Sequence, residues 1–217
     1  MNYLAHVLLS GQDPQWQLGG LLGDFIKGPL PNLDSLECSS STTPAHLLDA
    51  QNEPWSRAVL QGVRLHRRLD VFTDADSDTQ QCLALLGPSC RRFGAIALDV
   101  FLDHLLSRHW DEFHDQSLDH FSDHFYGVCE QQHNRLPRAA AGFIRSAANH
   151  HLFAGYGRWS VFEQVLESID RRIRFDSNVS EVGAEIKNQY HSLESILLPF
   201  MVRAQQQAKN LRGQSRL

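Results

Sequence analysis

Apolar residues recur along the chain every three to four positions, which is the spacing of helices with one buried face. No segment shows the strict alternation of apolar and polar residues that would indicate a strand. The predicted helices cover residues 3–10, 14–27, 53–72, 79–86, 90–113, 117–133, 138–153, 158–174 and 179–208. The pattern therefore predicts an all-α protein, a single-domain helical bundle of about seven to nine helices.

The segment between the second and third predicted helices is rich in Pro, Ser, Thr and Asn. Residues 29–54 include the run Ser39-Ser40-Ser41-Thr42-Thr43-Pro44, which is typical of a surface loop. Neither flank is a convincing domain by itself, and 217 residues suit one sizeable core. We therefore expect one domain over residues 1–204, followed by a polar tail over 205–217.

The charge and the cysteines narrow the class of protein. A net charge of −5 argues against a protein that binds nucleic acid through bulk positive charge. There is no run of 18 apolar residues, so no membrane span is expected, and the N-terminal segment lacks the basic flank of a signal peptide. The four cysteines form no Cys-x-x-Cys pair. We expect them to be free thiols in a reducing compartment, the cytoplasm.

The central predicted helix carries His66 and Asp70, four residues apart. Both lie on the face that continues through Val59 and Trp55, so both are expected to point toward the core. Side chains at this spacing are about 5–6 Å apart at Cβ, close enough for a nitrogen and a carboxylate oxygen to bind one metal ion. The alternative is a simple His–Asp hydrogen bond inside the core.

A second group of ionisable residues lies in the middle of the apolar helix predicted over 90–113. Asp99 and Asp103 are four residues apart, and His104 follows directly, all among Leu, Val and Phe. Three such groups are difficult to explain as a solvated face, because burying an unpaired charge is costly. Asp103 and His104 could reach one ion that lies over the edge between them, since adjacent helical residues diverge by about 100°.

Two earlier positions offer further candidate ligands. Asp24 follows the glycine-rich run Gly19-Gly20-Leu21-Leu22-Gly23, and these glycines permit close approach of another backbone or of a ligand. His6 lies on the stripe that contains Tyr3 and Leu9, where a histidine is as often a core residue as a ligand. A rival metal site is the pair His120 and His124, which lies off the apolar stripe of its helix and so favours a solvated face.

Four stretches give the sequence a resemblance to a known family. They are MNYLAH at 1–6, GDFIKG at 23–28, GVRLHRRLDVFTD at 62–74 and LDVFLDH at 98–104, with weaker matches at 151–156 and 169–172. With these motifs in this order, the sequence resembles the bacterial acyl carrier protein phosphodiesterases. Those enzymes are regarded as atypical members of the HD-domain superfamily of metal-dependent phosphohydrolases.

The resemblance implies an HD-domain-like helical fold with a divalent-metal site for Mn²⁺ or Mg²⁺. The implied reaction is hydrolysis of the phosphodiester that joins 4′-phosphopantetheine to a serine of holo acyl carrier protein, which yields the apo form. The candidate metal ligands are His6, Asp24, His66, Asp103 and His104.

A carboxylate that is not fully committed to the metal could orient or deprotonate the attacking water, and Asp70 and Asp99 are the candidates. Arg67 or Lys27 could contact the phosphate oxygens, although both could equally be solvated charges. Two other functions stay open. One is a phosphohydrolase of nucleotides or other small phosphate esters, and the other is a carrier-binding module without catalysis.

Carrier docking should depend on a local basic patch, because this chain and acyl carrier proteins are both acidic. Three arginine clusters are available, at 64–68, 91–92 and 171–174. The first surrounds the helix face that carries His66.

Overall fold

The computed structural model describes residues 1–33, 43–173 and 179–214. In these ranges the chain forms eleven α-helices and no β-strand. The helices are α1 (Tyr3–Leu9), α2 (Pro14–Leu22), α3 (Arg57–Ala75), α4 (Ser77–Leu86), α5 (Gly94–Arg108), α6 (Leu118–Gln131), α7 (Arg138–Asn149), α8 (Leu152–Gly155), α9 (Trp159–Asp170), α10 (Val179–Asn188) and α11 (Tyr190–Gln214). The all-α prediction is confirmed.

The expected count of seven to nine helices is too low because two predicted helices are interrupted. The predicted helix over 138–153 breaks at His151, whose backbone is left-handed with φ 47°. The predicted helix over 179–208 separates into α10 and α11 around Gln189. In addition, α11 continues through most of the expected polar tail, where Ala208 and Leu211 are buried.

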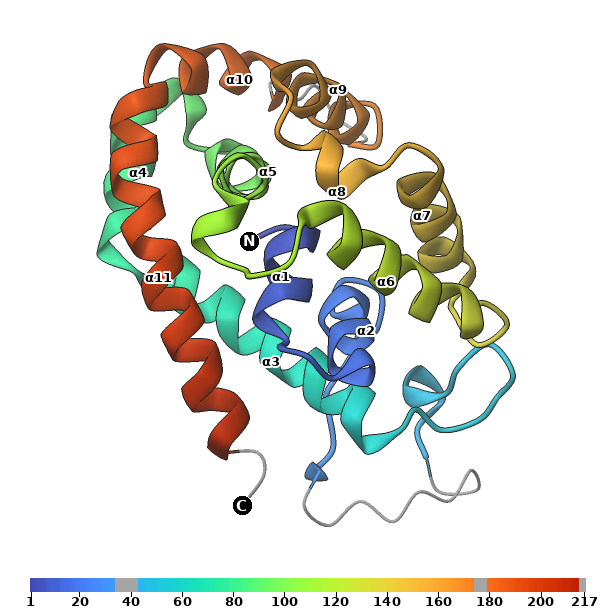
Figure 1. Cartoon of the computed structure of the whole chain (residues 1–217). Coiled ribbons are helices and arrows are strands. Elements are labelled where there is room, and N and C mark those ends of the chain that lie inside the picture. The colour runs from blue at the N-terminus through green and yellow to red at the C-terminus, as the bar shows by residue number, and fades with distance from the viewer. Residues whose placement is uncertain (34–42, 174–178, 215–217) are drawn as a thin grey trace.

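Helix α5 occupies the centre of the molecule. It contacts α1, α4, α8, α9, α10 and α11, and it is seen nearly end-on in Figure 1. Its apolar residues Leu98, Phe101, Leu102 and Leu105 are almost fully buried, so it supplies much of the core. The sequence explains this position, because α5 is apolar on nearly all sides and such a helix must be surrounded.

Helices α2 and α3 pack with their backbones in direct contact. A Cβ atom on Gly19 would lie 2.1 Å from the carbonyl oxygen of Val59, and one on Gly62 would lie 2.3 Å from that of Trp16. Only glycine fits at both positions, because real Cβ atoms do not approach a backbone oxygen so closely. This crossing brings the middle of α3 against the last turn of α2.

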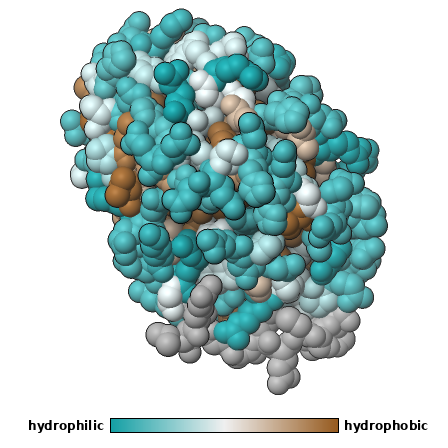
Figure 2. Space-filling model, in the orientation of Figure 1, coloured by the Kyte–Doolittle hydropathy of each residue, from teal (hydrophilic) through white to brown (hydrophobic). Residues whose placement is uncertain are grey.

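The surface in the view of Figure 2 is mostly hydrophilic, and its apolar residues appear in small separate patches. No helix in the described part of the chain is long and apolar enough to cross a membrane. Cys82, Cys90 and Cys129 are free thiols, while Cys38 lies outside the described residues together with the rest of 34–42. The cytoplasmic location stays a prediction.

Candidate metal centre

Three side chains from α1 and α3 converge beside the α2–α3 crossing. His6, His66 and Asp70 each offer a ligand atom, and these atoms all lie within 4.8 Å of one another. His6 Nε2 is 3.0 Å from Asp70 Oδ1, and His66 Nε2 is 3.1 Å from Asp70 Oδ2. Both histidines are buried, whereas the Asp70 side chain is 39% exposed, so the group opens to solvent on the carboxylate side.

The backbone of α2 fixes the orientation of His66. Its Nδ1 lies 2.7 Å from the carbonyl oxygen of Gly20, which can only accept, so Nδ1 carries the proton and donates. In the neutral ring Nε2 then holds a lone pair, and this lone pair faces the Asp70 carboxylate. A backbone carbonyl behind a histidine in this way is the usual support of a metal-ligating imidazole.

His6 stacks on His66 with the ring centroids 3.7 Å apart. Burial and the neighbouring His66 ring lower the pKa of His6 to about 3, so it is neutral at physiological pH. Its Nε2 is also 3.1 Å from the carbonyl oxygen of Met1, and its buried Nδ1 has no hydrogen-bond partner in the described chain. Because Nε2 of His6 faces two acceptors, the Met1 carbonyl oxygen and Asp70, it carries the proton of the neutral ring.

The three residues have the chemistry of a cation site. Burial alone would raise the pKa of Asp70, but hydrogen bonds from His6 and His66 hold it below its usual range. Asp70 is thus an anion, and His66 Nε2 lies 3.1 Å from it, so a lone pair on Nε2 would face this carboxylate directly. Two electron-pair donors this close need a cation, either a proton on Nε2 or a metal ion. Two imidazoles and a carboxylate suit a divalent transition metal.

Two further carboxylates border the group. Asp24 Oδ1 lies 3.8 Å from His66 Nε2, and the Asp24 side chain is 49% exposed. Asp99 Oδ1 accepts a hydrogen bond of 2.7 Å from the Met1 amino group, which also lies 3.8 Å from Asp70. Asp24 therefore lies beside the opening, while Asp99 lies behind the Met1 amino group.

A cluster of three aromatic side chains lies next to Asp24. Tyr3, Phe25 and Phe143 are all half-buried, and the Tyr3 and Phe143 rings are 4.1 Å apart. Burial and the nearby Asp24 raise the pKa of Tyr3 to about 12, so its hydroxyl stays protonated and can donate. The sequence alone does not indicate this aromatic cluster, because its members come from α1, the turn after α2, and α7. No local spacing connects them.

The structure places Asp103 away from this group, so its predicted role as a metal ligand gains no support from the geometry. Asp103 is fully buried, and its two oxygens accept hydrogen bonds of 2.9 Å from the backbone N–H groups of Leu4 and Ala5. These N–H groups belong to the first turn of α1 and have no partner within the helix. Asp103 therefore caps α1 and fixes the helix that carries His6.

His104 is likewise placed away from the group, and both of its nitrogens have protein partners. Nδ1 donates to the carbonyl oxygen of Tyr156 at 2.8 Å, and Nε2 is 3.0 Å from the Tyr190 hydroxyl. Burial lowers the pKa of His104, so it is a neutral core histidine. Asp103 and His104 point to different sides of α5, which explains why the two do not share an ion.

The Arg67 guanidinium contacts backbone instead of the open side of the group. It donates to the carbonyl oxygens of Gly28 at 2.7 Å and Ile26 at 2.6 Å. These bonds hold the segment that directly follows Asp24, so Arg67 positions Asp24 rather than reaching for a phosphate. Lys27 in the same segment is exposed and has no hydrogen bond or ion pair with a described residue.

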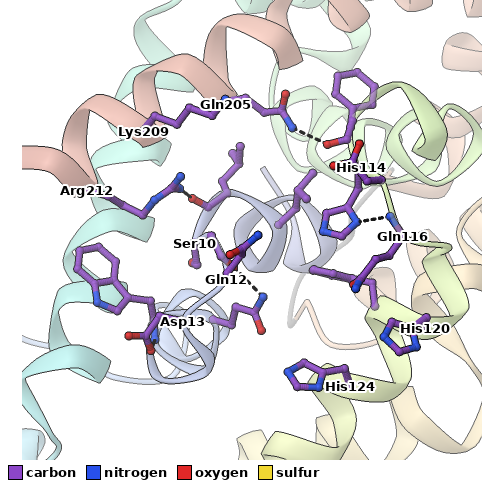
Figure 3. A pocket seen from close by; sticks show the side chains of 18 of the residues that line it. Ser10, Gln12, Asp13, His114, Gln116, His120, His124, Gln205, Lys209 and Arg212 are labelled. Carbon is purple, nitrogen blue, oxygen red and sulfur yellow. Dashed lines mark hydrogen bonds between the residues drawn. The ribbon is translucent and has the colours of Figure 1, made fainter.

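The rival histidine pair faces a different part of the molecule. A cavity of about 1070 Å³ lies at the C-terminal end of α1. Figure 3 shows His114, His120 and His124 on one side of it and Gln205, Lys209 and Arg212 from α11 on the other. Within the described ranges, only His6, His66 and Asp70 form a set of three ligand atoms this close together.

A substitution at Gly23 tests whether His66 must be held in place. A Cβ atom on Gly23 would lie 2.2 Å from Cγ of His66, so Gly23→Ala must displace the imidazole and its bond to Gly20. Losing such support costs about 10- to 100-fold in metal affinity. We expect Mn²⁺ affinity, measured by calorimetry, to fall by that factor.

Gly142→Ala is the matched control, because its Cβ would meet nothing within 4 Å. It should leave Mn²⁺ affinity unchanged and stabilise α7 by roughly 0.5–1 kcal/mol, the usual gain from replacing a helical glycine. Normal Mn²⁺ affinity in Gly23→Ala would show that the position of His66 does not matter for the metal.

Together, the helical fold and the His–His–Asp group, which opens to solvent at Asp70, define a helical protein with a candidate divalent-metal centre. The chain matches the model of the acyl carrier protein phosphodiesterase family over residues 1–40 and 45–204, and it belongs to that family. No solved structure shows significant similarity to it, so the HD-domain-like fold stays a prediction.

Curated acyl carrier protein phosphodiesterases align with nearly the whole chain. The acyl carrier protein phosphodiesterase of Enterobacter sp. strain 638 is 29% identical over 217 residues, covering 97% of this chain and 98% of the relative. Those of Serratia proteamaculans strain 568 and Escherichia coli O6:K15:H31 strain 536 are also 29% identical, covering 97% and 96% of this chain and 98% and 97% of the relative.

Proposed function

We propose that this protein is a divalent-metal-dependent phosphodiesterase that hydrolyses holo acyl carrier protein to the apo form and releases 4′-phosphopantetheine. The family assignment supplies the reaction class and the carrier as substrate. The observation that carries the metal dependence is the orientation of His66. Its Nδ1–H is fixed on Gly20, and its Nε2 faces Asp70 beside a neutral His6.

The metal we propose is Mn²⁺, with Mg²⁺ as the alternative, held by His6, His66 and Asp70. Imidazole ligands favour Mn²⁺ over Mg²⁺, which prefers an all-oxygen shell. When bound, such an ion supplies charge neutralisation for the phosphodiester anion and an activated water. The exposed side of Asp70 leaves room for a substrate oxygen, which a closed structural site would not.

Asp24 is our candidate for the residue that completes the site, as a fourth ligand or as the base. It is half-exposed, and it lies 3.8 Å from His66 Nε2 on the open side. A carboxylate there can accept a proton from the attacking water. Asp99 is a weaker candidate, because its carboxylate is already bonded to the Met1 amino group. Asp70 and the histidines then serve as ligands.

Tyr3 and Lys27 are the groups we propose for binding the phosphate oxygens. The Tyr3 hydroxyl stays protonated next to Asp24, and Lys27 carries an uncommitted ammonium three residues after Asp24. Phe25 and Phe143 would pack against the organic part of the phosphopantetheine group. This role replaces the phosphate contact expected of Arg67, whose guanidinium is bound to backbone.

Removal of the metal is the first test of this proposal. Protein treated with a chelator should not hydrolyse holo acyl carrier protein, and Mn²⁺ should restore the activity, as followed by intact mass of the carrier. Unchanged turnover after complete metal removal would refute the metal dependence. Stable carrier binding without any release would instead identify a binding module, and turnover of free nucleotides alone would identify a phosphohydrolase of small esters.

A further inference from the structure

A groove of about 810 Å³ runs along α3, between α3 and the C-terminal half of α11. We propose that this groove docks the acidic carrier protein substrate. The inference rests on the proposed function, and it assigns to the enzyme a protein-binding surface separate from the residues that hold the metal and the phosphate.

The rim of the groove is basic. Arg64, Arg67 and Arg68 all line it, although the chain as a whole carries a net charge of −5. The one carboxylate among the lining residues, Asp76, is already paired with Arg203 at 2.9 Å. The exposed Arg68 has no hydrogen bond or ion pair with any described residue. The local field is therefore positive and suits an anionic partner.

The floor of the groove is apolar. Leu30, Val71, Phe72 and Leu211 line it, and Val71 is 70% exposed, the most exposed of the large hydrophobic residues in the described ranges. A small anionic ligand would bind through charge alone and would leave this apolar strip uncovered. An apolar centre inside a charged rim is the usual organisation of a protein–protein interface.

The groove and the metal centre lie on different faces of the same helix. Successive helical residues diverge by about 100°, so the groove residues of α3 centre about 150° around the axis from the face that carries His66 and Asp70. Arg67 and Val71, which directly follow His66 and Asp70, form the rim nearest to the centre. A protein docked in the groove can extend over this rim toward the exposed side of Asp70.

The other basic clusters lack this combination. Arg171 pairs with Glu167 at 3.7 Å, and Arg172 Nε donates to the carbonyl oxygen of Ser168 at 3.0 Å. Arg92 lies over the Phe93 ring at 5.0 Å. None of these arginines lines the groove beside α3. Arg174, the last member of the third cluster, is outside the described residues.

The test compares a protein substrate with a small one. Arg68→Glu and Val71→Asp are measured with holo acyl carrier protein and with bis(4-nitrophenyl) phosphate, alongside binding of the carrier by calorimetry. Both variants should lower kcat/KM for the carrier by at least about 10-fold, because like charge and lost apolar contact disfavour docking. Hydrolysis of the small diester should change by less than about twofold, since it uses only the metal centre.

Arg91→Glu is the matched control, because it makes the same charge change at an exposed arginine outside the groove. It should leave kcat/KM for the carrier near the wild-type value. Raising the ionic strength to about 0.15 M, where the Debye length is about 8 Å, should slow the wild type on the carrier more than it slows Arg68→Glu.

Other results would overturn the proposal. An equal loss on both substrates would place these residues in the metal centre or the fold, and no loss on either would place the docking surface elsewhere. A dimer that Arg68→Glu dissociates, seen by light scattering, would make the groove an interface between two copies of this chain. If the wild type hydrolyses neither substrate, the proposed function fails. Carrier binding by the wild type and the two variants then tests separately whether the groove is the docking surface.

Discussion

Replacing His66 by alanine is expected to abolish hydrolysis of holo acyl carrier protein, with a loss of more than about 100-fold. A residue that merely supports a metal ligand costs 10- to 100-fold, and His66 is proposed as a ligand itself, with Nε2 3.1 Å from Asp70. Binding of Mn²⁺ should be lost in parallel. The measurements are single-turnover release of phosphopantetheine and Mn²⁺ calorimetry on the same preparation.

His120→Ala is the control for this prediction, because His120 belongs to the rival pair on α6 and is exposed. It should retain wild-type activity and Mn²⁺ affinity. Thermal unfolding of both variants is needed as well, because His66 is buried and its loss could also weaken the fold. If His120→Ala loses the metal and folded His66→Ala retains it, the metal belongs to α6.

Replacing Asp103 by alanine is expected to destabilise the protein by about 2–6 kcal/mol, since each of two buried N–H groups that lose their acceptor costs about 1–3 kcal/mol. The change leaves the N–H groups of Leu4 and Ala5 buried without an acceptor, and it also creates a cavity beside α1. The measurement is denaturant unfolding of the metal-free protein, which separates folding from metal binding.

Asp123→Ala gives the matched control, because this carboxylate is exposed on α6. Its unfolding free energy should stay within about 0.5 kcal/mol of the wild type, as for most surface changes. If Asp103→Ala leaves the unfolding free energy unchanged but greatly lowers the Mn²⁺ affinity, Asp103 is a metal ligand after all.

The local part of the site could be read from the sequence. His66 and Asp70 share a helix, and their spacing alone places them on one face, as the structure has them. The contribution of His6 could not be derived in this way. It depends on α1 lying against α3, and that packing follows from long-range contacts, including the Asp103 cap on α1.

Asp103 and His104 show the limit of reading inward polar residues as ligands. A buried carboxylate needs compensation, and backbone N–H groups at a helix start provide part of it, although burial still raises the pKa of Asp103 to about 7. The apolar neighbours of Asp103 are the same in both cases. Only the position of α1, distant in sequence, distinguishes a cap from a ligand.

The helix pattern was informative for element type and less so for element ends. The break at His151 requires a left-handed backbone at a residue that is not glycine, and the run Asn149-His150-His151 is only a weak signal for it, because such residues also occur inside helices. The continuation of α11 to Gln214 likewise depends on packing, because Ala208 and Leu211 find a buried environment that local composition does not specify.

The most direct test of the metal centre is crystallography of the protein with Mn²⁺, recorded so that the anomalous signal locates the ion. The account predicts a peak between His66 Nε2, His6 and Asp70, with Nδ1 of His66 still donating to the carbonyl oxygen of Gly20. An anomalous peak at His120 and His124, or one bound by Asp103 and His104, would contradict it.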